Sequence, residues 1–234
     1  GSRNMFFFDP LYFLFALPPL VVMIYAQIKV RSTYKKFSQV KNLRGVTGLE
    51  VARTLLYSQG LSHVKIERSE GMLTDHYDPR GKVLRFSPDV YNSASVASLG
   101  IVAHEIGHAL QDHTKFIPMT VRSALVIPAN IGTYAGYVFF ILGMVISRPE
   151  LVWVGVSLFG AAVLFSLVTL PVELDASHRA RKMLLSQGLV AQAEYNGASA
   201  VLSAAALTYV ASLLQAVANL LYYVVVALGM GRRD

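Results

Sequence analysis

The residues with the clearest chemical potential form the segment His-Glu-Ile-Gly-His at positions 104–108. On a helix, residues four apart share one face, so His104 and His108 can bind the same metal ion. Glu105 is rotated by about 100° from His104, which lets its carboxylate reach a water molecule bound to that ion. Two neutral imidazoles suit Zn²⁺, which lowers the pKa of its water enough for a carboxylate to remove a proton. The segment therefore predicts hydrolysis of a peptide bond, with Glu105 as general base.

A catalytic zinc ion of this type needs a third protein ligand and one open coordination position. Glu173 directly follows an apolar, charge-free stretch that ends at residue 172. A charged carboxylate is unfavourable where an apolar helix leaves the bilayer, and binding to a metal ion would explain its presence there. Asp175 and His178 are the nearby alternatives, rotated from Glu173 on a helix by about 200° and about 140°. We expect Glu173 to complete the site, with one Zn²⁺ per chain.

The composition indicates the environment in which this chemistry takes place. Of the 234 residues, 54% are apolar or aromatic and only 15% are charged. Soluble globular proteins carry about 25% charged residues, so intrinsic disorder and an ordinary soluble enzyme are both excluded. The sequence holds no cysteine, which excludes disulfide scaffolds, cysteine-bound zinc and thiol nucleophiles. The composition is that of an integral membrane protein.

Four segments are long and apolar enough to cross a bilayer as helices, which takes about 20 residues each. These predicted spans are residues 5–28, 123–147, 151–172 and 207–229. Residues 1–4, which precede the first methionine, look like an expression scar. We expect residues 29–118 and residues 173–206 to form one small catalytic α+β domain in a mainly α protein. Two spans separate these parts, so both fall on the same side of the membrane.

The basic residues lie mostly on one side of the predicted spans. That side carries Lys29, Arg31, Lys35, Lys36, Lys41, Arg44, Lys115, Arg122, Arg179, Arg181 and Lys182, against Arg148, Arg232 and Arg233 on the other. The positive-inside rule then places the catalytic domain in the cytoplasm and both termini outside, in a multi-pass protein of the inner (plasma) membrane. The net charge of +7 is thus juxtamembrane charge. We expect no nucleic-acid partner, because no basic patch with interleaved aromatic residues is present.

The polar part before the second span predicts elements that position the metal-binding residues. Residues 47–50 read Thr-Gly-Leu-Glu, a capping-box pattern that opens a helix ending near Gly60. Residues 64–66 alternate between apolar and polar, as in a short strand. Residues 95–112 predict a longer helix, which carries the two histidine ligands.

A hairpin is predicted shortly before that longer helix. Residues 78–81 read Asp-Pro-Arg-Gly and fit a type I turn at every position, joining residues 74–77 to residues 82–86. His76 and Tyr77 on this hairpin could donate to an oxyanion, or they could simply fix the turn. The edge of the hairpin could also pair with an extended substrate.

These residues resemble those of the YugP-type bacterial neutral zinc metallopeptidases, which are distantly similar to HtpX-like and CAAX-processing membrane metallopeptidases. The resemblance covers nearly the whole chain after Met5 and rests on four segments: GMLTDHYDP at 71–79, AHEIGHALQ at 103–111, ELDAS at 173–177 and AAALTYV at 204–210. It implies a gluzincin-like fold, one zinc ion, and endopeptidase activity on membrane or misfolded proteins.

The chain departs from the wider HtpX-like group at one position. In that group the third ligand is a Glu followed four residues later by an Asp, and the Glu matches Glu173. Ser177 stands where the Asp is expected, so the usual carboxylate support of a zinc-binding histidine is missing. Asp112 and Asp175 are alternatives for that support.

Together these features predict a zinc-dependent membrane endopeptidase that hydrolyses peptide bonds of membrane-associated or misfolded proteins. One alternative is an intramembrane zinc protease, although the uncharged run before His104 is too short to span a bilayer. The other is a zinc-bearing membrane scaffold that does not cut. The expected partners are a peptide or membrane-protein substrate and the lipid bilayer. Gly132, Gly136 and Gly143 would in addition permit close helix packing in a homo-oligomer.

Overall fold

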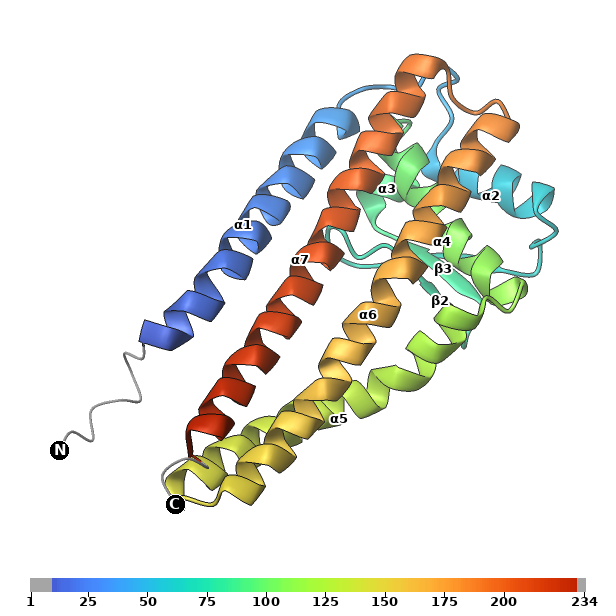
Figure 1. Ribbon diagram of the computed structural model, residues 1–234. Coiled ribbons are helices and arrows are strands. Elements are labelled where there is room, and N and C mark those ends of the chain that lie inside the picture. Colours follow the sequence, from blue (N-terminus) through green and yellow to red (C-terminus); the bar gives the residue numbers. More distant parts are fainter. Residues whose placement is uncertain (1–9, 231–234) are drawn as a thin grey trace. The chain divides into compact units, whose positions relative to one another are not determined.

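The computed structural model describes residues 10–230 of the chain (Figure 1). The predicted expression scar at residues 1–4 and the first residues of the predicted first span lie outside the described residues. The chain divides into two compact units. The helical unit comprises Gly1–Tyr25, Val121–Leu170 and Thr208–Asp234, and the mixed unit comprises Ala26–Thr120 and Pro171–Leu207.

The described residues contain four helices that are long and apolar enough to cross a membrane, as the sequence predicts. They are α1 (Pro10–Ser38), α5 (Ile117–Val145), α6 (Pro149–Ser186) and α7 (Gln192–Met230). Each extends beyond its predicted apolar segment at one end at least, while α5 stops at Val145, before the predicted end at residue 147. The extensions of α6 and α7 contain Ala, Leu, Arg, Lys and Met, which favour helix, so a helix does not end where its apolar run ends. Glu173 consequently lies inside α6.

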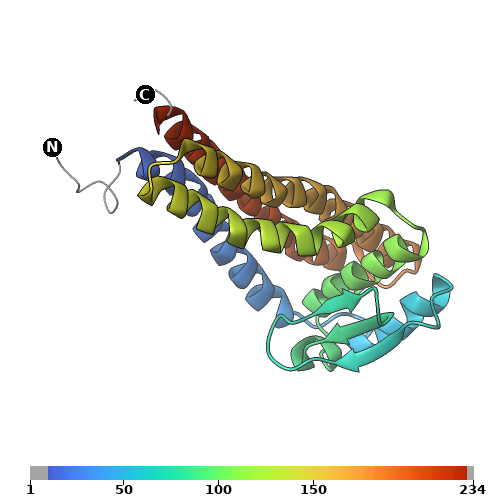
Figure 2. The ribbon, with the colours of Figure 1, turned by 90° about the horizontal axis from the view of Figure 1, so that it is seen from below.

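Helices α5 and α6 form an antiparallel hairpin within the helical unit, seen as the yellow-green and gold helices of Figure 2. The three glycines of α5 face α6: a Cβ atom at Gly143 would lie 2.6 Å from the Val152 nitrogen, and one at Gly136 would lie 3.1 Å from the Gly155 oxygen. Tyr223 of α7 stacks on Phe159 at a centroid distance of 4.4 Å. The glycines thus serve packing within the chain, and self-association stays a prediction.

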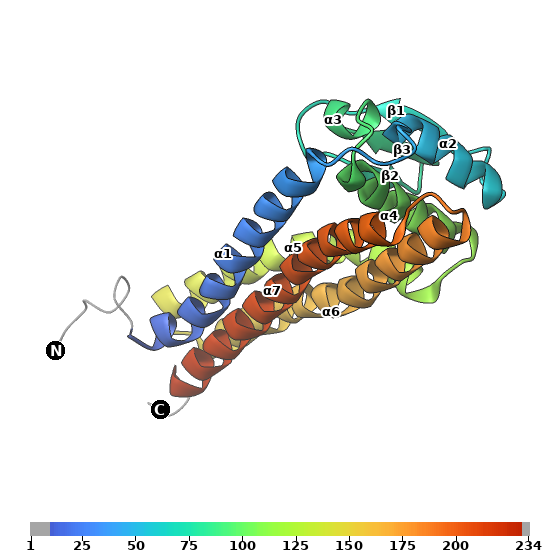
Figure 3. The same cartoon turned by 90° about the horizontal axis from the view of Figure 1, so that it is seen from above.

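The mixed unit contains a three-stranded sheet of β1 (Lys65–Arg68), β2 (His76–Asp78) and β3 (Val83–Phe86), in the order β1-β3-β2 (Figure 3). Strand β3 pairs antiparallel with β2 and parallel with β1. The Asp78 carboxylate accepts hydrogen bonds from the Arg80 and Gly81 nitrogens, at 2.9 and 3.2 Å, and so holds the turn between β2 and β3. The predicted hairpin is confirmed. Its parallel neighbour β1 adds an arrangement that the sequence did not indicate.

Three further helices complete the mixed unit: α2 (Gly48–Ser58), α3 (Pro88–Tyr91) and α4 (Val96–His113). The capping box at the start of α2 is confirmed, since the Thr47 side chain accepts from the Glu50 nitrogen and the Glu50 carboxylate accepts from the Thr47 nitrogen. The Ser95 side chain caps α4 by accepting from the Ser98 nitrogen. These caps satisfy backbone donors that would otherwise lack partners at the helix starts.

Helix α4 lies at the centre of the mixed unit. Leu99, Val102 and Ile106 on it are fully buried in a core that also includes Leu55 of α2 and Phe86 of β3. Burial on most sides fixes the rotation of α4 about its axis, because turning the helix would expose these apolar side chains to water. The histidines of α4 therefore point in a defined direction.

Gly107 lets α4 approach α6 closely. A Cβ atom at this position would lie 2.6 Å from the Ala176 carbonyl oxygen, a distance that real Cβ atoms do not tolerate. The obstacle is backbone, which cannot swing aside as a flexible side chain can. The contact sits between His104 and His108 in sequence and three residues from Glu173 on the facing helix.

We predict that Gly107→Ala lowers the free energy of unfolding by about 1–3 kcal/mol, the range for overpacking a close contact. Gly160→Ala is the matched control, because nothing lies within 4 Å of a Cβ atom there. The control should leave the thermal unfolding midpoint unchanged or slightly raised, since alanine favours helix. Thermal unfolding of the detergent-purified variants measures both, and equal midpoints would contradict the close approach.

Candidate metal centre

Three side chains from two helices of the mixed unit converge on one point. His104 and His108 come from α4 and Glu173 comes from α6, and one donor atom from each lies within 4.8 Å of the others. The Glu173 Oε2 atom is 3.1 Å from His104 Nε2 and 3.4 Å from His108 Nε2. The two imidazole rings meet edge to face at a centroid distance of 4.7 Å. Within residues 10–230, no other set of three His, Cys, Asp or Glu donors gathers in this way.

The donor set fits zinc in both chemistry and spacing. Two imidazole nitrogens and a carboxylate oxygen are common zinc ligands, and bond lengths near 2.0–2.1 Å place neighbouring ligands of a tetrahedral ion about 3.3 Å apart. The two observed nitrogen–oxygen separations lie on either side of this value. The Glu173 side chain is only 2% exposed. A buried carboxylate needs a positive partner, and the position between two imidazoles is suited to a metal cation.

The two alternative third ligands do not face the histidines. The Asp175 carboxylate accepts hydrogen bonds from Gln111 at 2.8 Å and from Arg179 at 2.6 Å. His178 lines a different cavity, together with Lys182. The helical rotation that separates both residues from Glu173 accounts for this difference. The structure thus brings together the ligand set that the sequence favoured.

A buried glutamine supports His108. Gln111 is fully buried, and its amide Nε2 donates to the Val172 carbonyl oxygen and to the Asp175 carboxylate, each at 2.8 Å. Both partners can only accept, so the amide oxygen must face His108, whose Nδ1 atom is 3.0 Å away. An amide oxygen cannot donate, so Nδ1 carries the proton and Nε2 presents its lone pair toward Glu173. This is the tautomer that binds a metal through Nε2.

Ser177 orients the imidazole of His104, as Gln111 orients that of His108. Its hydroxyl oxygen is 3.1 Å from His104 Nδ1 and can accept the proton of that nitrogen. The hydroxyl therefore stands in the place of the carboxylate that the sequence lacks here, although a neutral acceptor supports the imidazole less strongly than a charged one. The two carboxylates that the sequence offered as alternative supports do not contact a histidine directly. Asp112 bonds Tyr77 and Lys82, and Asp175 reaches His108 only through Gln111.

Glu105 lies on α4 beside the two imidazoles and is only 8% exposed. Burial raises the pKa of its carboxyl group above the usual range, and the positive charge of His104 and His108 opposes that rise in part. No hydrogen bond holds this carboxylate among the described residues, which leaves it free to contact a water molecule. A carboxylate with a raised pKa is a better proton acceptor near neutral pH.

His108 responds to the same buried surroundings. Burial alone lowers its pKa, but the hydrogen bond and the charge of Glu173 outweigh this effect and raise the pKa above its ordinary value. A cation at this point is thus favoured electrostatically, and either a proton on the imidazole or a metal ion supplies it.

His76 and Tyr77 are engaged outside the metal centre. The Tyr77 hydroxyl donates to the Asp112 carboxylate at 2.6 Å, and burial together with this bond raises the pKa of the phenol. His76 is exposed, and its Nδ1 atom lies 2.8 Å from the Thr74 carbonyl oxygen. These contacts favour the second alternative for His76 and Tyr77, in which the two side chains stabilise the hairpin.

Gln111 is the residue that sequence reasoning missed. Its position three residues after His108 places both on one face of α4, which is a usable indication. What distinguishes it from any other glutamine is its contact with residues 61 and 64 positions further along the chain.

Four apolar helices and a buried His-His-Glu donor set define a membrane protein with a candidate zinc centre. Residues 12–228 match a family described as "Putative neutral zinc metallopeptidase". The chain is 39% identical over 218 residues to "Putative membrane protease YugP" of Bacillus subtilis (strain 168), which covers 93% of this chain and 97% of that protein. No solved structure matches it. The chain belongs to this neutral zinc metallopeptidase family, and the resemblance seen in the sequence is confirmed.

We predict about one zinc ion per chain in the purified protein and a loss or strong weakening of zinc binding in Glu173→Ala. His178→Ala is the matched control, since His178 is five residues further along α6 and lines a different cavity. Elemental analysis of both variants and of the wild type measures the ratio. Zinc retained in Glu173→Ala but lost in His178→Ala would reverse the assignment of the third ligand.

We also predict that Gln111→Ala weakens zinc binding by about 10–100-fold, the usual cost of losing a partner that orients a ligand. Asp112→Asn, at the next position of α4, should change zinc affinity by less than about twofold, because Asp112 contacts no ligand. Competition with a chelator of known affinity reports both values. Equal effects of the two substitutions would count against the role of Gln111.

Proposed function

We propose that this chain is a zinc-dependent endopeptidase of the plasma membrane that hydrolyses peptide bonds of membrane-associated or misfolded proteins. The observation that carries the proposal is the convergence of His104, His108 and Glu173 within 4.8 Å, in a member of a zinc peptidase family. His104 and His108 act as ligands through Nε2, and Glu173 acts through a carboxylate oxygen. Their supports, Gln111 and Ser177, hold the imidazoles in the required tautomer.

When bound, zinc would polarise the peptide carbonyl and acidify a water molecule for attack on it. Glu105 accepts the proton of the attacking water, which forms the new carbon–oxygen bond. It then donates this proton to the nitrogen of the leaving amine as the carbon–nitrogen bond breaks, and returns to the carboxylate. The burial that raises the pKa of Glu105 suits a group that must both take and give a proton.

Two features support a substrate that is a polypeptide near the membrane. Strand β2 is an edge strand that packs against α4, so an extended peptide could add to the sheet beside the metal centre. Glu173 directly follows the charge-free run 151–172, which places the end of that apolar segment next to a ligand. The distribution of basic residues favours the cytoplasmic side for the mixed unit.

The two alternatives receive less support. An intramembrane protease would carry its ligands in the spanning helices, whereas His104 and His108 lie on α4, which is not one of the four. Glu173 does lie on α6, but it follows the charge-free run of that helix rather than standing within it. A non-cutting scaffold would be favoured if the missing carboxylate at position 177 left His104 without support, but the Ser177 hydroxyl meets His104 Nδ1.

We predict that Glu105→Gln keeps zinc at about one per chain but lowers peptide hydrolysis by about 100-fold or more, because the general base is lost. Glu67→Gln, which neutralises an exposed carboxylate on β1, should retain activity. The assay is cleavage of casein and of proteome-derived peptides by the detergent-purified, zinc-loaded protein. Undiminished cleavage by Glu105→Gln would overturn the mechanism, and a wild type that cuts nothing while binding zinc would favour the scaffold.

A further inference from the structure

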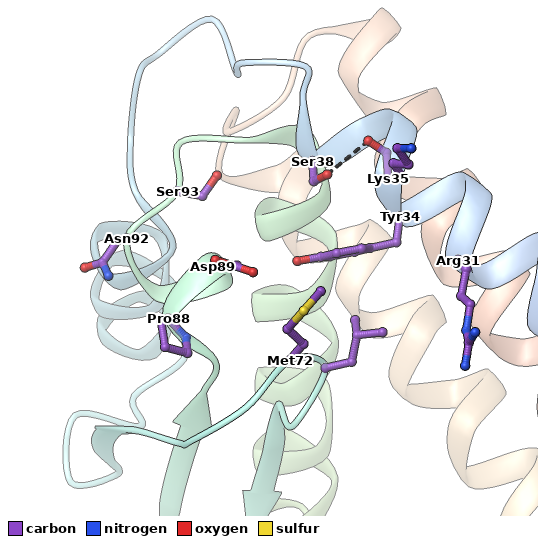
Figure 4. Close-up of a pocket in the computed structure, with 10 residues that line it drawn as sticks. Arg31, Tyr34, Lys35, Ser38, Met72, Pro88, Asp89, Asn92 and Ser93 are labelled. Atoms are coloured by element: carbon purple, nitrogen blue, oxygen red, sulfur yellow. Dashed lines mark hydrogen bonds between the residues drawn. The ribbon is translucent and has the colours of Figure 1, made fainter.

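A cavity of about 950 Å³ lies within the mixed unit, apart from the three metal ligands (Figure 4). It is lined by the last turns of α1, by the loop between β1 and β2, and by α3. Helix α1 contributes Arg31, Tyr34 and Lys35, and α3 contributes Asp89. None of these residues has a part in the proposed hydrolysis.

Two cations line the α1 side of the cavity. Arg31 and Lys35 are four residues apart, so their side chains leave the same face of the helix one turn from each other. Both are exposed, and neither forms an ion pair with another described residue. The two side chains point in different directions (Figure 4), but both are exposed and long enough to turn toward one phosphate group, which offers several charged oxygen acceptors.

The position of these cations along α1 indicates the source of the phosphate. The charge-free run of α1 ends at Ile28, three residues before Arg31 and seven before Lys35. At a rise of about 1.5 Å per residue, the two cations stand about 5–10 Å beyond the apolar segment. The lipid headgroups add roughly 5–8 Å to each face of the hydrocarbon core, so Arg31 stands within this layer and Lys35 stands just outside it, where its long side chain can reach back to a headgroup.

The loop that borders the cavity carries two exposed apolar side chains. Met72 is 70% exposed and Leu73 is 47% exposed. Leu73 adopts a left-handed backbone with φ of 55°, which costs free energy for a leucine, and a 2.7 Å hydrogen bond between the Ser69 and Thr74 hydroxyls closes the loop around it. A loop that holds large apolar groups outward next to a phosphate site is suited to contact acyl chains.

Asp89 restricts which headgroup fits. Its carboxylate has no hydrogen-bond partner among the described residues, and Tyr34 extends across the cavity toward it (Figure 4). Because a carboxylate only accepts hydrogen bonds, a matching headgroup must bring donors of its own beyond the phosphate. The ammonium of phosphatidylethanolamine and the hydroxyls of phosphatidylglycerol are donors, whereas the trimethylammonium of phosphatidylcholine is not.

We propose that this cavity binds the headgroup of a glycerophospholipid that carries hydrogen-bond donors, with its phosphate at Arg31 and Lys35 and its donors at Asp89. The site goes beyond the proposed hydrolysis and does not depend on it. Met72 and Leu73 contact the start of the acyl chains.

The test is direct lipid binding by the full-length, delipidated protein in detergent, read by native mass spectrometry. The probes are phosphatidylglycerol, phosphatidylethanolamine and phosphatidylcholine with identical eight-carbon acyl chains. We expect the first two to bind about tenfold more tightly than the third, the size of one charge-assisted hydrogen bond. Asp89→Asn, which barely changes size, should remove the preference for phosphatidylethanolamine over phosphatidylcholine.

A matched pair of double variants isolates the phosphate contact. Arg31→Gln with Lys35→Gln should weaken phosphatidylglycerol binding by about tenfold or more. Lys29→Gln with Lys36→Gln removes the same charge from the same helix outside the cavity lining, and should change the affinity by less than about twofold. Equal losses in the two pairs would overturn the proposal in favour of diffuse surface charge, as would equal binding of all three lipids.

Two further probes distinguish other occupants. Glycerol 3-phosphate has the phosphate without acyl chains, so competition by it at the same concentration as the lipid would overturn the lipid assignment in favour of a soluble phosphate compound. An acidic peptide that displaces phosphatidylglycerol at lower concentration would overturn it in favour of a substrate cleft. Failure of both to compete, with the preferences above, is the result expected for a lipid site.

Discussion

A carboxylate removed from water beside two imidazoles is the constraint on which the mixed unit depends. Glu173 is buried on α6, and its charge is tolerable only where positive charge or a metal ion can face it. This requirement brings α4 and α6 together, and Gly107 makes the approach sterically feasible. The apolar core around α4 then fixes the direction of the histidines, so packing and electrostatics specify the same arrangement.

Gln111 joins these two helices in a second way. Its amide group has three partners: His108 on its own helix, and Val172 and Asp175 on α6. The two contacts with α6 form only when α4 and α6 lie in register. A buried amide that loses a partner costs free energy, so the network penalises small slips between the helices. Gln111 therefore both orients His108 and fixes the register of the two helices that supply the donor set.

Much of the fold could be predicted because its determinants are local. The capping box at Thr47, the turn at Asp78 and the apolar runs of four helices act over a few neighbouring residues, and each was confirmed. The parallel pairing of β1 with β3 could not be predicted, because the sequence of a short strand does not specify which other strand it pairs with. Likewise, the apolar run predicted a span that ends at residue 172, but it did not show how far the helix continues, and α6 extends to Ser186. His104 and His108 were predictable from helical spacing and Glu173 from its place after the apolar run, but the supports Gln111 and Ser177 depend on long-range contacts.

The continuity of α6 has a consequence for biosynthesis. The ribosome releases the two histidines before the hairpin of α5 and α6, and Glu173 follows only after α5 and the charge-free first part of α6 have been made. Because Glu173 belongs to the same uninterrupted helix as the third apolar segment, the donor set stays incomplete until membrane insertion of that segment is under way. The order of residues along the chain thus delays completion of the donor set until the nascent protein has reached its membrane.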